Sequence, residues 1–264
     1  MTFPAVPETF YWTNEAWGPA LRCRPLEAVA QHVFTSRQLE LPSAEASKLL
    51  APLVGAPPDR FLTLNQVHGR DVVIIRRGIA AESVRQMQKQ RPVADAFVSN
   101  APDVAVVVRA ADCVPLLIAD RATGAVAAIH AGWRGTAARA AVAAIDAMAR
   151  EFSSRPVDLI VAIGPAIGPC CYEVGSDLVD AFAAAGHERY LIDRWFMTPR
   201  GSRMRLDVSG ANRDQLILAG VPEPQIHSAD LCTAEHLGVL TSYRAEKERA
   251  TRIGGVIRAS SVSL

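Results

Sequence analysis

The stretch PLLIADRATGAVAAIHAGWRGTAARAA (residues 115–141) decides the fold that we predict for this chain. Its two runs at 115–120 and 124–130 are apolar up to their last residue, which is typical of strands that are buried on both faces. The sequence TGAV between them predicts a tight hairpin, whose two strands are antiparallel. The start of the outgoing strand and the end of the returning strand therefore lie at the same edge of the predicted sheet.

Further runs rich in valine and isoleucine lie on both sides of this hairpin, at residues 71–76, 104–109 and 157–164. Proline-containing segments at 53–60 and 89–95 are predicted as loops. The strands come in clusters with helical segments between them, rather than in strict strand–helix alternation. This order favours an α+β fold in which mixed β-sheets pack in layers with helices outside, an α/β/β/α-like sandwich. We expect it to form a single domain over residues 1–264.

Three segments show the pattern of helices with capping residues. The first is predicted over 135–152, with Thr136 able to cap its start. The second and third are predicted over 176–186 and 209–220. Each of these two begins at a serine and ends at a glycine that suits the left-handed backbone after a helix.

The composition is that of an ordinary globular protein, with 50% hydrophobic and 21% charged residues. The formal net charge of +1 implies neither nucleic acid nor an anionic membrane as an electrostatic partner. We find no apolar run near the ~18 residues of a spanning helix, and the first residues do not resemble a signal peptide. Five cysteines, an odd number, favour reduced thiols in a cytoplasmic protein over a disulfide framework.

Two histidines and one cysteine stand at the edges of predicted strands: His68, Cys113 and His130. The hairpin brings Cys113 and His130 to the same edge. Two imidazoles and one thiolate make a three-ligand zinc set that leaves a fourth position open, as in catalytic sites. We therefore predict about one equivalent of zinc per chain at these residues. A structural role is the alternative, because a histidine at a strand end is commonly hydrogen-bonded and a buried cysteine commonly acts as a small hydrophobe.

Seven motifs occur along the chain in a fixed order: NQVHG, ADAFVSN, ADCVPLLIAD, HAGWRGT, AIGPAIGPCCYEVG, CT and SYR. With these motifs the chain resembles the YfiH-like laccase-domain family from about residue 60 to residue 244. That family was long labelled multicopper polyphenol oxidase and is now associated with purine nucleoside phosphorolysis. The resemblance implies that the metal ligands are the histidine of QVHG, the cysteine of ADC and the histidine of HAGWRG, which are His68, Cys113 and His130.

The resemblance further implies a zinc-dependent purine nucleoside phosphorylase that could also deaminate adenosine. Phosphate would be the co-substrate, and copper could load the same ligands in vitro. Asp112, beside the ligand cysteine, is a candidate acid–base residue, or else a carboxylate that caps nearby backbone. Arg134 could hold phosphate as a rigid fork, or stack on Trp133. Arg244 is a second anion-binding candidate. We expect purine nucleosides and phosphate as partners, and a monomer or a weak homo-oligomer.

Three other functions remain open. A copper-dependent polyphenol oxidase needs further histidine-rich copper centres, and only four histidines remain, with no His-x-His pair among them. A cysteine-nucleophile hydrolase would use Cys113 with His130, which a metal-bound thiolate could not do. The tail SYRAEKERATRIGGVIR (242–258) keeps Arg244 but lacks the Arg-Asp-Gly that typically follows in the family. A binding relic with altered substrate is therefore the third alternative.

Overall fold

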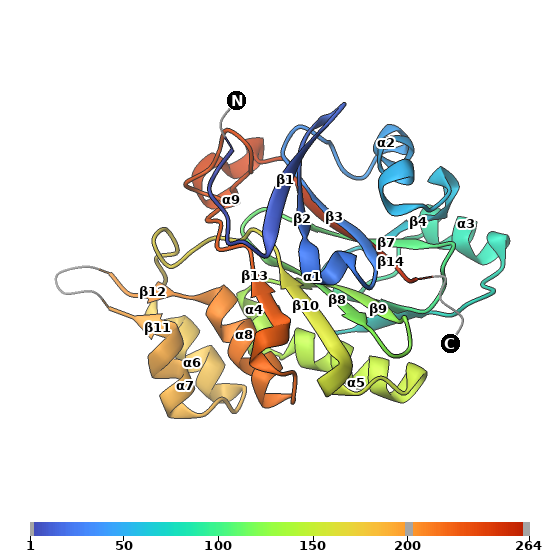
Figure 1. Cartoon of the computed structure of the whole chain (residues 1–264). Coiled ribbons are helices and arrows are strands. Elements are labelled where there is room, and N and C mark those ends of the chain that lie inside the picture. The colour runs from blue at the N-terminus through green and yellow to red at the C-terminus, as the bar shows by residue number, and fades with distance from the viewer. Residues whose placement is uncertain (1–2, 199–202, 261–264) are drawn as a thin grey trace.

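Two six-stranded mixed sheets form the centre of the computed structural model, which describes residues 3–198 and 203–260 (Figure 1). The first sheet has the order β1-β2-β3-β14-β7-β4, with bounds Phe10–Glu15, Gly18–Cys23, Gln31–Thr35, Ile253–Arg258, Ala105–Ala110 and Phe61–Thr63. The second has the order β13-β10-β8-β9-β6-β5, with bounds Ile226–Ser228, Leu159–Ile163, Val114–Asp120, Val126–Ala131, Ala96–Ser99 and Val72–Ile75. Strands β11 (Phe196–Met197) and β12 (Arg205–Leu206) form a small separate ribbon.

The helices in the described ranges are α1 Arg24–Glu27, α2 Ala44–Val54, α3 Ala81–Lys89, α4 Trp133–Ala137, α5 Ala140–Phe152, α6 Ser176–Ala184, α7 Arg189–Trp195, α8 Val208–Leu218 and α9 Tyr243–Glu246. Short 3-10 helices lie at η1 Pro58–Arg60, η2 Pro156–Asp158, η3 Glu223–Gln225 and η4 Lys247–Arg249. Among the residues described here, no helix combines the length and apolar character needed to cross a membrane.

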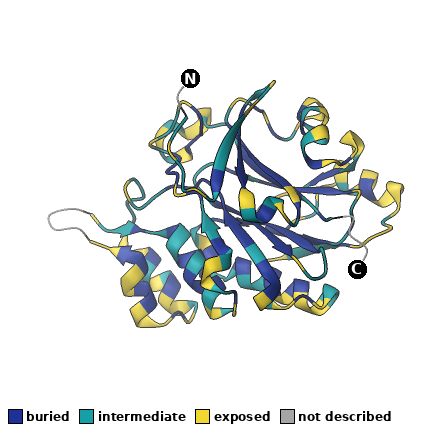
Figure 2. Ribbon diagram, in the orientation of Figure 1, coloured by how far each residue is buried: buried dark blue, intermediate teal, exposed yellow. Residues whose placement is uncertain are grey.

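Three apolar clusters define the layers. The first lies between the two sheets and buries Phe34 and Val108 of the first sheet with Leu117 of the second. Another joins the outer face of the second sheet to α4–α8, and a third joins the outer face of the first sheet to α2. Figure 2 shows the same division, with the sheet strands buried and the outer helix faces exposed. The predicted α/β/β/α arrangement is confirmed, and hydrophobic burial between layers is its main source of stability.

The predicted helix over 135–152 is wrong at its start. The structure has two helices there: α4 begins after Gly132, and α5 begins after Arg139, whose φ of 59° is left-handed. The Arg139 guanidinium donates to two backbone carbonyls just after α6, both at 2.8 Å, so contacts with a distant helix hold the break. Thr136 lies inside α4, and its buried hydroxyl accepts a hydrogen bond from α8 instead of capping a helix.

The other two predicted helices are confirmed as α6 and α8. The glycines after them, Gly186 and Gly220, have positive φ values of 75° and 92°, as a left-handed C-terminal residue requires. Their N-terminal caps are not the predicted serines. Gly175 precedes α6, and the Asp207 side chain caps α8 by accepting the N–H of Gly210 at 2.8 Å.

Candidate metal centre

The β8–β9 hairpin brings Cys113 and His130 to the same end of two central strands of the second sheet, as predicted. The two strands are antiparallel, with Val114 opposite Ala131 and Pro115 opposite His130. Every residue of both strands is buried, so packing on both faces fixes the hairpin. Cys113 directly precedes β8 and therefore lies across from the end of β9.

His68 reaches the same end of these strands from a loop whose backbone is held by a single carboxylate. The φ of His68 is 64°, in the left-handed region that a residue other than glycine rarely adopts. The N–H groups of Val67, His68 and Gly69 donate to the Asp95 carboxylate at 3.2, 2.9 and 2.6 Å. These three bonds stabilise the unusual backbone of the loop.

The same carboxylate orients the second histidine. Oδ1 of Asp95 lies 2.8 Å from Nδ1 of His130, and both side chains are buried. Because Nδ1 is engaged, Nε2 is the ring nitrogen left for a metal, an arrangement common among metal-binding histidines. Sequence reasoning missed Asp95, which lies in the segment 89–95 predicted as a loop. The signal that could have found it was a carboxylate directly before the apolar run of ADAFVSN.

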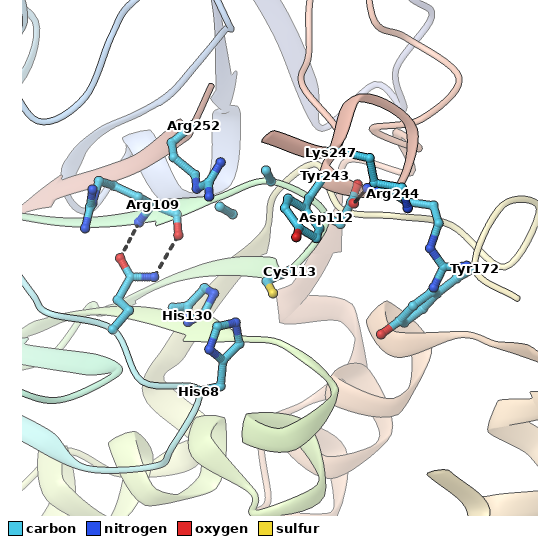
Figure 3. Close-up of a pocket in the computed structure, with 13 residues that line it drawn as sticks. His68, Arg109, Asp112, Cys113, His130, Tyr172, Tyr243, Arg244, Lys247 and Arg252 are labelled. Carbon is cyan, nitrogen blue, oxygen red and sulfur yellow. Dashed lines mark hydrogen bonds between the residues drawn. The ribbon is translucent and has the colours of Figure 1, made fainter. Parts of the chain in front are cut away.

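The three predicted ligands converge in space (Figure 3). One ligand atom from each of His68, Cys113 and His130 lies within 4.8 Å of the other two, and the two imidazole centroids are 5.0 Å apart. A Cβ atom at Gly132 would stand 2.8 Å from Cys113 Sγ and 3.0 Å from His68 Cδ2, so this position leaves room only for glycine. Two imidazoles and a thiol are donors that both zinc and copper accept. The residues present therefore fit a metal ion.

Hydrogen bonds within the group control its titration. Burial alone would raise the pKa of the Cys113 thiol, but hydrogen bonds with His130 and His68 outweigh burial and lower that pKa to about 6. Burial alone would lower the pKa of His130, but its bonds to Asp95 and Cys113 raise that pKa to about 9. Burial also disfavours the charged form of Asp95, whose pKa is nonetheless lowered by its bonds to His130 and Gly69. These hydrogen bonds favour the carboxylate of Asp95, the imidazolium of His130 and the thiolate of Cys113 when no metal is bound.

The three residues line a cavity of about 560 Å³ whose other walls carry cations (Figure 3). These are Arg109 of β7 and, from the C-terminal segment, Arg244, Lys247 and Arg252. Burial, followed by repulsion from Arg91 and Arg252, lowers the pKa of Arg109. Cations that repel one another at the wall of a cavity favour an anionic ligand there.

Asp112 lines the cavity, but both of its carboxylate oxygens are engaged. Oδ1 accepts the hydroxyl of Thr233 and Oδ2 accepts the backbone N–H of Arg244, each at 2.6 Å. Asp112 also has a φ of 86°, so these contacts stabilise a left-handed backbone directly beside Cys113. The structure therefore shows the contacts of the backbone-capping alternative.

The two predicted arginines lie in different surroundings. Arg244 lines the cavity, donates to the carbonyl of Glu173 at 2.8 Å and stands over the ring of Tyr172 at 5.1 Å. Arg134 is exposed and stacks on Trp133, with its guanidinium 4.3 Å from the ring centroid. Within the described part of the chain, Arg134 is not among the residues that line the cavity.

The fold and the site together define a class of protein: an α/β/β/α sandwich with a candidate metal centre of two imidazoles and one thiol at one end of its second sheet. The centre opens into a cavity that also offers cations and aromatic rings. The chain belongs to the family described as multi-copper polyphenol oxidoreductase laccase, whose model matches residues 41–260.

Relatives of known name support this assignment. A purine nucleoside phosphorylase of Deinococcus radiodurans is 35% identical over 216 residues, which are 82% of this chain and 77% of that protein. Adenosine deaminase RL5, from an unknown prokaryotic organism, is 32% identical over 216 residues, 81% of each chain. The crystal structure of YlmD from Geobacillus stearothermophilus matches with a TM-score of 0.80 at 27% identity, and covers 95% of this chain and 99% of that chain. The family resemblance inferred from the motifs is confirmed.

Proposed function

We propose that this chain is a zinc-dependent purine nucleoside phosphorylase that also deaminates adenosine, with His68, Cys113 and His130 as the metal ligands. The observation that carries the proposal is the convergence of these ligand atoms at a cavity with cationic walls. The names of the relatives support the substrate class. The proposal takes residues 1–264 as one cytoplasmic domain, monomeric or weakly homo-oligomeric, that acts on purine nucleosides and phosphate.

The side chains of the cavity suit the two halves of such a substrate. Tyr172 and Tyr243 line it and offer aromatic rings against which a purine base can stack. Burial, followed by the negative charge of Cys113, raises the pKa of Tyr172 to about 12, so its hydroxyl stays neutral and can donate a hydrogen bond. A zinc ion held by two imidazoles and a thiolate would supply a Lewis acid and acidify a bound water molecule.

Phosphate is assigned to the cationic side of the cavity. Arg109 donates to the carbonyl of Leu64 only at 3.4 Å, and its Nε has no hydrogen-bond partner among the residues described. Arg109 can therefore turn donors toward an oxyanion, and an arginine fork matches phosphate geometry. Arg252 lines the same wall and adds positive charge, although its Nη1 already donates to the carbonyls of Ala250 and Thr251. Asp112 serves in this proposal as a positioning residue, because it accepts the backbone N–H of Arg244 on one oxygen while the Thr233 hydroxyl holds the other.

One observation favours a second candidate function. Asp95, His130 and Cys113 are arranged in the order of a carboxylate–histidine–cysteine triad, which a cysteine-nucleophile hydrolase would use. Metal content separates the two candidates, since a thiolate that binds zinc is not free to attack a substrate. The copper oxidase has less support, because it needs several histidine-rich copper centres. Among the described residues, the group of His68, Cys113 and His130 is the one candidate metal group that contains histidine.

The test combines elemental analysis with turnover of inosine and adenosine, with and without phosphate. We expect zinc in the purified protein, a loss of about one equivalent in Cys113→Ala, and release of free base that depends on phosphate. Cys23→Ala, at a buried cysteine of β2, is the matched control and should keep zinc and turnover. Zinc content unaffected by Cys113→Ala would refute the metal centre. If the metal-free wild-type protein turns over substrate and Cys113→Ala abolishes that activity, the hydrolase is favoured.

The anion site is tested separately. Arg109→Ala and Arg244→Ala should raise the KM for phosphate while zinc content stays at the wild-type level. Arg134→Ala tests the first expectation from the sequence. If Arg134→Ala alone raises the KM for phosphate, the anion binds on the exposed side of α4 and the cavity wall does not hold it.

A further inference from the structure

A second group of metal-ligating side chains lies outside the candidate metal centre. The Sγ atoms of Cys170, Cys171 and Cys232 all lie within 4.8 Å of one another, and all three cysteines are free. We propose that these three thiols form a second metal site, which takes a thiophilic d10 cation such as zinc, cadmium or copper(I). The evidence for this site does not rest on the proposed enzymatic function.

The two segments that supply the thiols are fixed to each other by backbone contacts. Ala166 and Cys232 form a parallel β-bridge. The N–H of Ala166 donates to the carbonyl of Leu231 at 3.2 Å, and the N–H of Thr233 donates to the carbonyl of Ala166 at 3.0 Å. The approach of Cys232 to the Cys170–Cys171 pair is therefore built into the fold and does not depend on a free loop.

Gly168 allows the chain to pass closely over the sulfur atoms. Its N–H donates to Cys232 Sγ at 3.3 Å, and its carbonyl accepts the N–H of Cys171 at 3.0 Å. A Cβ atom at this position would stand 3.1 Å from Cys170 Sγ and 3.3 Å from Cys232 Cβ. The glycine thus lets the turn fold back so that adjacent cysteines face the third thiol.

The sulfur geometry suits a cation of this class. Zinc–sulfur bonds of about 2.3 Å place the sulfur atoms of one ion roughly 3.8–4.0 Å apart, inside the observed limit of 4.8 Å. Soft thiolates select zinc, copper(I) and similar ions over magnesium or calcium. Cys170 is exposed and offers an entry path, while Cys232 is buried and anchors the site.

The position of the thiols relates the second site to the cavity wall. Tyr172, which lines the cavity, follows Cys171 directly, and Thr233, which donates to Asp112 at 2.6 Å, follows Cys232. A cation held by all three thiols would cross-link the segments that carry these two residues. We therefore assign the site a structural role, with the cation bracing one wall of the cavity.

Cadmium is the probe, because its bonds to thiolates give an ultraviolet charge-transfer absorption. The full-length Cys113→Ser protein removes the thiol of the first centre and is titrated with cadmium under reducing conditions. We expect charge-transfer absorption that saturates at one cadmium per chain. The absorption should be lost when Cys170→Ser or Cys232→Ser is added, and kept when the control Cys23→Ser is added. Because Cys170 is exposed, Cys170→Ser should fold, and it tests the site even if Cys232→Ser does not fold.

Two results would overturn the proposal. One is a cadmium titration of Cys113→Ser without thiolate absorption, or with absorption that Cys170→Ser leaves intact. The other is a disulfide between two of these cysteines, found by peptide mass analysis in protein purified under reducing conditions, because that bond would remove two of the three ligands.

Discussion

Asp95→Asn is the most informative single change, because one buried carboxylate holds both histidines of the candidate metal centre. Asp95 accepts four hydrogen bonds, two on each oxygen, from Val67, His68, Gly69 and His130. Asparagine has nearly the same shape but offers only one acceptor oxygen. Whichever way the amide turns, two donors then face an NH2 group.

The cost follows from those two lost bonds. A hydrogen bond to a charged group contributes about 1.5–3 kcal/mol, so the free energy of unfolding should fall by about 3–6 kcal/mol. At about 2 °C per kcal/mol for a chain of this length, the melting temperature should fall by about 6–12 °C. Residues that orient metal ligands also contribute about 10–100-fold in metal affinity, so zinc binding should weaken by that factor.

Calorimetry measures the first effect, and zinc competition with a chelator measures the second. Asp146→Asn, at an exposed carboxylate of α5, is the matched control and should change stability by less than about 0.5 kcal/mol. The reasoning is refuted if Asp95→Asn melts within 2 °C of the wild type, a margin well below the ~6 °C expected, and retains its zinc affinity.

Three further changes probe the surroundings of the centre. Gly132→Ala places a Cβ 2.8 Å from Cys113 Sγ. Overpacking of about 1–3 kcal/mol should weaken zinc binding roughly 5–150-fold. The control is Gly238→Ala, where a Cβ meets nothing within 4 Å, and this variant should bind zinc normally. In metal-free protein the thiolate of Cys113 should form as the pH rises through about 6, so its alkylation rate should increase there; an increase only near pH 9 would contradict the hydrogen-bonded site. Because the pKa of this acid is lowered in the folded state, its contribution to stability is complete above about pH 9 and lost as the pH falls through about 6. Thr233→Val removes the partly buried 2.6 Å bond to Asp112 and should reduce stability in urea by about 1.5–3 kcal/mol. A loss below 0.5 kcal/mol, the usual range for neutral surface changes, would show that this bond contributes little.

The hairpin and its two ligands could be predicted from the sequence because their signals are local. Continuous apolar runs joined by TGAV specify the pairing of β8 with β9, and that pairing alone brings Cys113 to the level of His130. The layered fold could also be predicted, since segments buried on both faces need cover on both sides. His68 was added to the set by its residue type and its place before an apolar run.

What could not be predicted depends on contacts between distant segments. The role of Asp95 arises only when β6 pairs with β9 and the His68 loop folds over both, so a loop prediction for 89–95 concealed it. The break at Arg139 is held by carbonyls after α6, which override the helix propensity of an Ala-rich stretch. The first three strands and β14, which together form much of the first sheet, lack the apolar runs that marked β5, β7, β8, β9 and β10.

The two sides of the cavity belong to different sheets, and this has a consequence for how the protein could change. The ligands Cys113 and His130 stand at the ends of β8 and β9 in the second sheet, with His68 in a loop beside them. Arg109 lies on β7 of the first sheet, and Arg252 directly precedes β14 of that sheet. Side chains of the C-terminal segment that line the cavity can therefore change, and with them the preference for the group that binds opposite the ligands, while the backbone N–H of Arg244 still holds Asp112 beside Cys113. Libraries that randomise the tail should yield variants with altered selectivity that still load metal, whereas libraries at the hairpin edge should yield mostly inactive protein.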